Sequence, residues 1–165
     1  MRAIFHADRR WGIGRANDLM YRLPLDMKFF RETTKGKVVV MGLNTLRSFP
    51  DGKPLKNRTN IVLCPDDVEG EVLTVHSLGE LLAKVKEYPA DDVFVIGGAS
   101  VYRLLIPYCS EVLVTKVDAD GNADTFVPDL DADVRFALVH ESAPMEDNGY
   151  TIRFCTYRNL SPIPF

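Results

Sequence analysis

Asp26 is the acidic residue whose position in this sequence most clearly indicates a chemical role. It stands two residues after Pro24, at the start of an apolar helical segment that contains Phe29 and Phe30. An acidic residue in the first turn of a helix often serves only to stabilise the helix dipole. If the carboxylate is instead buried beside the aromatic rings, it needs a cationic or hydrogen-bonding ligand, and an amidine-like ring offers two parallel N–H donors. The residues around Asp26 leave both interpretations open.

Two strand-to-helix junctions have the composition of phosphate-binding turns. They are Ile96-Gly-Gly-Ala-Ser-Val-Tyr102 and Met41-Gly-Leu-Asn-Thr-Leu46, and the second adds the hydroxyl of Thr45. Backbone N–H groups at a helix start bind phosphate, and glycines let it approach the chain. Neither junction matches GxGxxG, and glycine pairs at such places are often only tight turns. Together the two junctions predict a site for a dinucleotide pyrophosphate at the carboxyl ends of parallel strands.

A glycine-containing segment, Trp11-Gly-Ile-Gly-Arg-Ala-Asn17, precedes the Asp26 helix. It has the flexibility of a loop that closes over a ligand and excludes water. A surface connection with no gating role explains the same residues equally well. The segment predicts a loop near the site and leaves its motion open.

Alternating strand and helix patterns must position these segments. Continuous apolar β-branched runs predict strands covered on both faces, at residues 37–41, 59–63, 93–96 and 111–117. Helical patterns accompany them at residues 25–33, 44–48, 78–87 and 99–107. This alternation predicts parallel pairing through right-handed crossovers. Residues 134–141 and 150–157 flank a turn-rich stretch and predict an antiparallel hairpin.

The predicted fold class is therefore α/β, with a three-layer mixed central sheet that is mostly parallel and has an antiparallel C-terminal edge. The chain has 165 residues, of which 46% are hydrophobic and 26% charged, and this composition excludes a disordered or collagen-like protein. We expect one domain over residues 1–159. Residues 160–165 form a tail whose two prolines cannot join a central ladder.

Composition also limits the partners. Twenty Lys and Arg against 23 Asp and Glu give a net charge of −3, so there is no general electrostatic basis for binding nucleic acid or an anionic membrane. No apolar run has the length of a membrane-spanning helix, and the N-terminal run ends at Asp8, so we expect a cytoplasmic protein. Cys64, Cys109 and Cys155 lie far apart, which predicts three reduced thiols and no metal site. A monomer is the default expectation.

Taken in order, these segments closely resemble dihydrofolate reductase over residues 1–159. Each motif is weak alone, but their joint order across nearly the whole domain is specific. The matching residues are Gly12-Ile-Gly14, Leu23-Pro-Leu-Asp26, Phe30, Thr34, Val40-Met-Gly42 with Thr45, Pro54-Leu55 with Arg58, Ile96-Gly-Gly98 with Tyr102, Thr115, and Asp124-Thr-Phe126.

The resemblance implies hydride transfer from NADPH to C6 of 7,8-dihydrofolate with protonation at N5, which gives tetrahydrofolate for one-carbon metabolism. Asp26 matches the active-site carboxylate, which accepts hydrogen bonds from the 2-amino group and N3 side of the pterin, and the proton reaches N5 from water. Thr115 matches the residue that helps hold the pterin amino group and its water. Tyr21 replaces the family's tryptophan and could hydrogen-bond the water near Asp26 through its hydroxyl.

The resemblance also implies the remaining site residues. Arg58 matches the arginine that binds the glutamate α-carboxylate of the substrate. Ile4, Phe30 and Leu55 match the residues that sandwich the pterin and the aminobenzoate ring. Residues 9–23 would be a lid loop with Asp124 as its partner when closed, and antifolates are expected inhibitors. Cofactor contacts are implied at Ala7, Ile13, Gly14, Leu19, Gly42, Thr45, Gly97, Gly98, Ser100 and Tyr102.

The sequence departs from the family where the adenosine 2′-phosphate is bound. Leu43 and Ser100 stand where the family often has basic residues, and Cys64-Pro-Asp-Asp67 replaces a Ser/Thr/Arg cluster. A carboxylate there would repel a 2′-phosphate and could accept a hydrogen bond from a free ribose hydroxyl. We therefore expect a weakened preference for NADPH, with relaxed use of NADH. Alternatively, the positive charge comes from Arg47, Lys53 or His76.

Two other functions remain to be compared with this one. A reductase of similar fold, such as the one in riboflavin biosynthesis, is the enzymatic alternative, and Asp26, Phe30 and Arg58 argue against it. The second is a nucleotide- or folate-binding protein without turnover. Substrate-dependent loss of the reduced nicotinamide absorbance would distinguish an enzyme from a binding protein.

Overall fold

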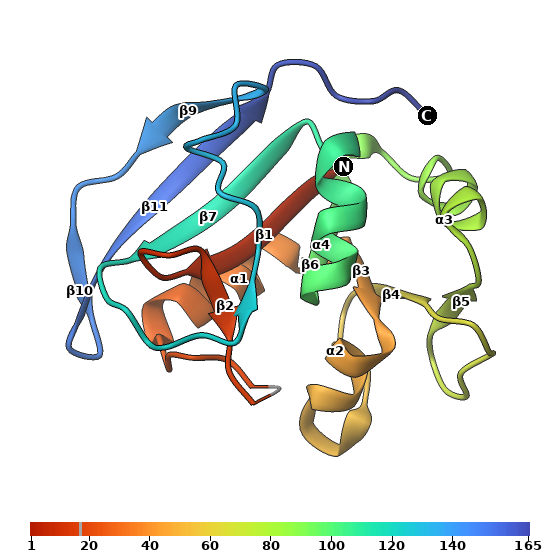
Figure 1. Ribbon diagram of the computed structural model, residues 1–165. Helices are drawn as coiled ribbons and strands as arrows, with labels where there is room; N and C mark the ends of the chain where they lie inside the picture. Colours follow the sequence, from red (N-terminus) through yellow and green to blue (C-terminus); the bar gives the residue numbers. More distant parts are fainter. Residues whose placement is uncertain (17) are drawn as a thin grey trace.

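The computed structural model describes residues 1–16 and 18–165 and has a twisted central sheet with helices on both faces (Figure 1). Among these residues nine strands form the sheet, in the order β10-β11-β7-β1-β6-β3-β4-β5, with β9 beside β11. The strands from β7 to β5 are parallel, and β9, β10 and β11 pair antiparallel. The fold class expected from the sequence is confirmed.

Most element bounds agree with the sequence patterns within a few residues. The central strands are β1 (Arg2–Ala7), β6 (Val93–Gly97), β3 (Val38–Gly42), β4 (Thr59–Leu63), β5 (Leu73–Val75) and β7 (Glu111–Val117). The helices are α1 (Pro24–Thr34), α2 (Leu43–Ser48), α3 (Leu78–Val85) and α4 (Ala99–Leu105). Short 3₁₀ turns cover Pro50–Gly52, Ala90–Asp92 and Ile106–Tyr108.

The antiparallel edge differs from the predicted simple hairpin. Strands β9 (Phe136–Glu141) and β11 (Tyr150–Asn159) do pair, but β10 (Met145–Asp147) forms inside the stretch expected to be a turn. The tight turn between β10 and β11 is Asn148-Gly149, and both residues have positive φ, at 53° and 85°. This is the backbone of a type I′ turn, which favours Asn-Gly because both central residues need a positive φ.

The two faces of the sheet have separate cores. Ala3, Phe5 and Ala7 on β1 pack with α4 and α3 in the larger cluster. Because side chains alternate across a strand, Ile4 and His6 point to the opposite face, where His6 contacts α1. Strand β3 divides in the same way, since Val38 and Val40 belong to the larger cluster and Val39 and Met41 to a second one. The apolar runs are therefore covered on both faces, as expected for a central parallel strand.

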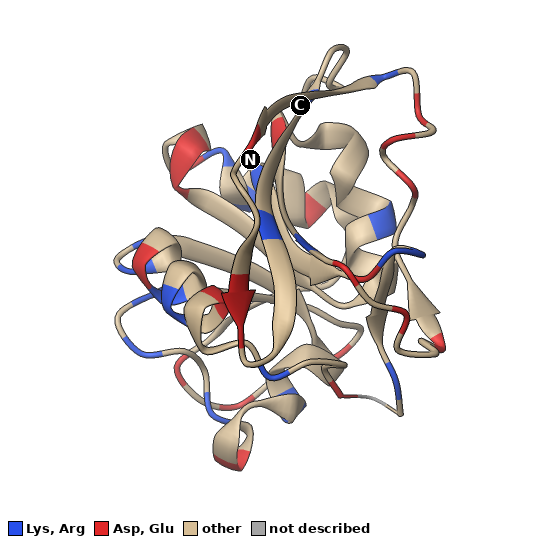
Figure 2. Cartoon of the chain, turned by 90° about the vertical axis from the view of Figure 1, so that its left-hand side faces the viewer, with Lys and Arg blue, Asp and Glu red and all other residues tan. Residues whose placement is uncertain are grey.

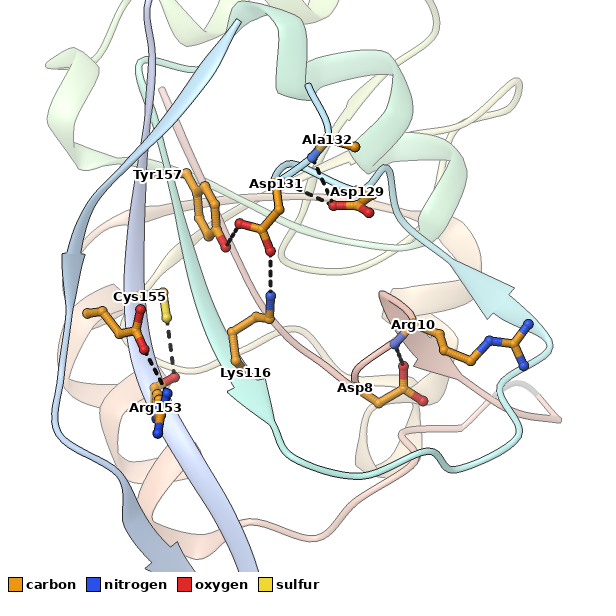
Figure 3. Close-up of polar contacts among 10 residues, drawn as sticks. Asp8, Arg10, Lys116, Asp129, Asp131, Ala132, Arg153, Cys155 and Tyr157 are labelled. Carbon is orange, nitrogen blue, oxygen red and sulfur yellow. Dashed lines mark hydrogen bonds and ion pairs between the residues drawn. The ribbon is translucent and has the colours of Figure 1, made fainter. Parts of the chain in front are cut away.

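Polar contacts on the α4 face fix the antiparallel edge to the loop that precedes β9 (Figure 3). Asp131 accepts hydrogen bonds from Lys116 Nζ at 3.0 Å and from the Tyr157 hydroxyl at 2.7 Å. The Lys116 ammonium also lies 4.2 Å from the centre of the Trp11 ring. Acidic and basic residues are interspersed over the side of the molecule shown in Figure 2.

The three cysteines are free and buried. Burial raises the pKa of the Cys109 thiol to about 12 and that of Cys155 to about 11. Within residues 1–16 and 18–165, no helix is long and apolar enough to cross a membrane. The same residues contain no cluster of three or more His, Cys, Asp or Glu that could hold a metal ion.

Candidate active site

The start of α1, which carries Asp26, is fixed by a residue from the other end of the chain. Leu23 at the N-cap position makes no side-chain cap. The buried carboxylate of Asp147 on β10 accepts hydrogen bonds from the backbone N–H groups of Leu25 and Asp26, each at 3.1 Å. A negative charge at this helix end is also favourable for the helix dipole. Asp147 therefore caps this helix and also supplies negative charge at its start, so Asp26 is not needed for that purpose.

Replacing Asp147 with alanine is expected to lower the free energy of unfolding by about 1–2 kcal/mol, the usual cost of losing a helix N-cap. It should also lower kcat/KM for the substrate, because the backbone of Asp26 loses its anchor. Urea unfolding and steady-state kinetics measure the two effects. Glu146→Ala is the matched control, since Glu146 is the exposed neighbour on the same strand. Equal stability of both variants would contradict the capping role.

The Asp26 carboxylate is held by two neighbouring strands. Thr115 Oγ1 on β7 donates to Asp26 Oδ1 at 2.6 Å, and His6 Nδ1 on β1 lies 3.2 Å from Asp26 Oδ2. His6 and Thr115 are direct partners in the parallel register of β1 and β7. The Asp26 side chain is 14% exposed. This geometry favours the buried, ligand-binding interpretation of Asp26 over the dipole interpretation.

Tyr21 lies near this group, but its hydroxyl points elsewhere. Its ring centre is 6.1 Å from that of His6 and 4.8 Å from that of Tyr150. A Cβ on Gly121 would stand 2.6 Å from the Tyr21 hydroxyl oxygen, so this hydroxyl is directed at the Gly121 loop. It is buried and has no hydrogen-bond partner in the described part of the chain. Burial, and next the charge of Asp8, raise the pKa of Tyr21. A link to water near Asp26 stays a prediction.

Two of the residues expected around the substrate, Arg58 and Phe30, lie at the C-terminal half of α1. Arg58 Nε donates to the Thr34 hydroxyl at 2.9 Å, and its other nitrogens donate to the carbonyls of Lys56 and Arg31. Burial, and next the charge of Arg31, lower the pKa of Arg58. Phe30 lies one helical turn after Asp26, and its carbonyl accepts from the Thr34 hydroxyl. The guanidinium is therefore fixed at the end of the helix that carries Asp26.

The two glycine junctions meet, because β3 and β6 are neighbours in the sheet. A Cβ on Gly97 would lie 3.3 Å from Tyr102 Cε2 and 3.4 Å from Thr45 Oγ1. Gly97 has a φ of 123°, which side chains rarely adopt, and its peptide bond to Gly98 is cis. The Tyr102 hydroxyl donates to the Ile4 carbonyl at 2.8 Å. Thr45, Gly97 and Tyr102 thus form one cluster at the carboxyl ends of the central strands, while Ser100 is exposed on α4.

The glycine loop pairs with the segment that contains Asp124. Strand β2 (Gly12–Gly14) pairs with β8 (Thr125–Phe126), and Asp124 Oδ2 accepts from the Ala16 N–H at 2.9 Å. That hydrogen bond is the main reason that the pKa of Asp124 is lowered. The buried Asp8 carboxylate accepts from the N–H groups of Arg10, Gly12 and Gly121 (Figure 3 draws the first). Asn17 of the predicted lid lies outside the described residues.

The side chains expected at the nicotinamide differ in exposure. Ala7 is buried in the core beside the loop, and Ile13 packs partly against the same core. Leu19, in contrast, is 66% exposed although it is apolar. A single exposed apolar side chain is common on protein surfaces, so a contact of Leu19 with the nicotinamide stays a prediction.

Comparison with known proteins decides the family. A family model for dihydrofolate reductase matches residues 1–159. Dihydrofolate reductase of Enterococcus faecium is 36% identical, over 98% of each chain, and that of Bacillus subtilis is 34% identical, over 93% of this chain and 91% of that one. The chain belongs to the dihydrofolate reductase family. A solved structure of dihydrofolate reductase from Enterococcus faecalis, complexed with NADP(H) and RAB-propyl, superposes with a TM-score of 0.81 at 35% identity, over 96% and 95% of the chains.

In this dihydrofolate reductase, His76 lies beside the segment Cys64-Pro-Asp-Asp67. The imidazole of His76 is held between Asp67 Oδ1, 2.9 Å from Nε2, and the carbonyl of Cys64, 3.1 Å from Nδ1. The hydrogen bond to that carbonyl, and next the charge of Asp67, raise the pKa of His76. The positive charge of protonated His76 is therefore already paired with a carboxylate. Arg47 and Lys53 are exposed on the segment that follows β3.

Two residues that shape this dihydrofolate reductase site were missed from the sequence. His6 had a usable signal, because it stands two residues after Ile4 and strand alternation places both on one face. Asp147 had none, because a residue 121 positions from Asp26 gives no local sign of capping its helix.

Proposed function

We infer that this protein is an NADPH-dependent dihydrofolate reductase, which transfers a hydride from NADPH to 7,8-dihydrofolate and yields tetrahydrofolate for one-carbon metabolism. The observation that carries this function is the partly buried Asp26 carboxylate, held by Thr115 and His6 in a chain of this family. The test is the initial rate of dihydrofolate reduction by purified protein, followed at the reduced-cofactor absorbance. Absorbance loss that does not depend on dihydrofolate would contradict the proposal.

In the proposed substrate site, Asp26 accepts hydrogen bonds from the 2-amino group and N3 side of the pterin. Thr115 keeps one carboxylate oxygen in place and helps hold the amino group. A carboxylate on the N3 side does not reach N5, so water delivers the proton there. Arg58 binds the glutamate α-carboxylate, since its guanidinium is already fixed by three acceptors. Ile4, Phe30 and Leu55 enclose the rings.

The proposed cofactor site fits a dinucleotide. Gly97 and Gly98 leave the space that a Cβ would fill, beside Thr45 and Tyr102. These residues and Gly42 bind the pyrophosphate and ribose region, and Ala7, Ile13, Gly14 and Leu19 lie along the nicotinamide. The contact between Asp124 and Ala16 supports a closed position of residues 9–16, the first half of the proposed lid, over the site. Amidine-like antifolates are expected to bind Asp26 in place of the pterin.

We further propose that NADH serves as an alternative cofactor. Leu43 and Ser100 offer no positive charge, Asp66 and Asp67 add negative charge, and His76 is paired with Asp67. Each charge-assisted hydrogen bond to the 2′-phosphate is worth about 1.5–3 kcal/mol. Because such bonds are missing here, kcat/KM for NADPH should exceed that for NADH by less than about a hundredfold. Parallel initial-rate assays measure this ratio. An advantage of several hundredfold for NADPH would refute the relaxed preference.

A charge-restoring variant gives the matched comparison. Leu43→Arg is expected to raise the NADPH to NADH ratio by about tenfold, because one charge-assisted hydrogen bond to the 2′-phosphate is regained. Val134→Arg adds the same charge at a fully exposed apolar position away from these junctions and should leave the ratio unchanged.

We also propose that the protein works as a monomer in the cytoplasm. The three buried cysteines are free, as is usual in a reducing compartment. Sedimentation velocity at micromolar concentration tests the monomer.

A further inference from the structure

His6 contacts the carboxylate of Asp26, and the proposed function gives it no contact with the pterin or the cofactor. Its Nδ1 is 3.2 Å from Asp26 Oδ2, and its side chain is 8% exposed. Its other ring nitrogen, Nε2, is buried and has no hydrogen-bond partner within residues 1–16 and 18–165. Burying a polar ring costs free energy unless the ring is hydrogen-bonded. The contact with Asp26 therefore supplies the hydrogen bond that the buried His6 ring needs.

The geometry fixes which ring nitrogen carries hydrogen. A carboxylate oxygen only accepts hydrogen bonds, so an unprotonated Nδ1 would face it with a lone pair against a lone pair. Nδ1 therefore carries hydrogen and donates to Oδ2. Since Nε2 has no partner among the described residues, this bond alone sets the tautomer and the ring orientation.

We propose that His6 is a positioning residue for Asp26. Thr115 holds Oδ1 from β7 while His6 holds Oδ2 from β1, and the two residues are register partners on adjacent parallel strands. Two donors on one side fix the rotation of the carboxylate group. The remaining lone pairs of both oxygens then face the pterin donors without prior reorganisation, which is how a positioned group accelerates a reaction. This role rests on the proposed function of Asp26.

Three variants separate the donor from the bulk of the side chain. In His6→Asn the side-chain amide nitrogen stands close to the place of Nδ1 and keeps the donor. In His6→Gln the amide lies farther along the chain, near the place of Nε2, and His6→Leu has no donor. His140→Asn is the matched control, because His140 is an exposed histidine on β9.

The expected result is a selective loss for the pterin substrate. His6→Leu and His6→Gln should lower kcat/KM for dihydrofolate by about tenfold, the effect of losing one hydrogen bond to a charged group, and should leave the Kd for NADPH unchanged. His6→Asn should stay within about threefold of the parent protein, and His140→Asn should equal it.

Two results would overturn the role of His6. One is a folded His6→Leu protein with the kcat/KM of the parent. The other is a His6→Asn protein as impaired as His6→Leu at equal thermal stability, which would mean that packing alone matters.

A measurement on the parent protein needs no variant to fold and no activity. The ¹⁵N chemical shifts of the His6 ring should show a protonated Nδ1. A ring with hydrogen only on Nε2 would overturn the inference whether or not the protein reduces dihydrofolate.

Discussion

Asp26→Asn is expected to lower kcat for dihydrofolate by about 10²- to 10⁴-fold near neutral pH, the range typical for loss of a group that assists proton transfer. The reason is that one of the two oxygens becomes an NH₂ group, which cannot accept from His6 or from the pterin. The amide also carries no negative charge to favour protonation of the ring. Steady-state kinetics and NADPH titration by fluorescence measure turnover and cofactor binding separately.

The cofactor should bind this variant as tightly as it binds the parent protein, because Asp26 contributes to the substrate side of the site. Glu32→Gln is the matched control, since it neutralises an exposed acid on the same helix and should leave turnover unchanged. Turnover by Asp26→Asn at the parental rate would refute the role of this carboxylate.

Gly97→Ala should both destabilise the protein and weaken NADPH binding. At a φ of 123° an alanine is strained, and its Cβ would lie 3.3–3.4 Å from Tyr102 and Thr45. Such backbone strain costs about 1–3 kcal/mol. We expect a lower melting temperature and a Kd for NADPH at least about tenfold higher, because the methyl group enters the space proposed for the pyrophosphate.

Gly79→Ala provides the comparison for this effect. Gly79 lies in α3 with ordinary helical φ, and an added Cβ would have only the Ser77 hydroxyl at 3.9 Å. Alanine is a better helix former than glycine, so this variant should be as stable as the parent or slightly more stable. A Gly97→Ala protein with parental stability and NADPH affinity would contradict the close approach at this junction.

The sequence predicted the fold class because the signals that define it are local. The runs at β3, β4, β6 and β7 are rich in apolar β-branched residues, as expected when both faces of a strand are covered. The order of the weak motifs was enough to predict the family. Strand β10 was missed although Asn148-Gly149 is a strong hairpin signal, because the surrounding residues had been interpreted as one continuous turn.

The sequence by itself also determined the residue types of the site, with a carboxylate before two aromatic rings and glycines at two strand ends. Only the tertiary structure decided how these residues are held. Asp26 receives His6 from β1, Thr115 from β7 and Asp147 from β10. The Tyr21 hydroxyl is directed at Gly121, and His76 is paired with Asp67. The physical reason is that hydrogen bonds between distant segments depend on strand order and register, whereas helix and strand patterns depend on neighbours along the chain.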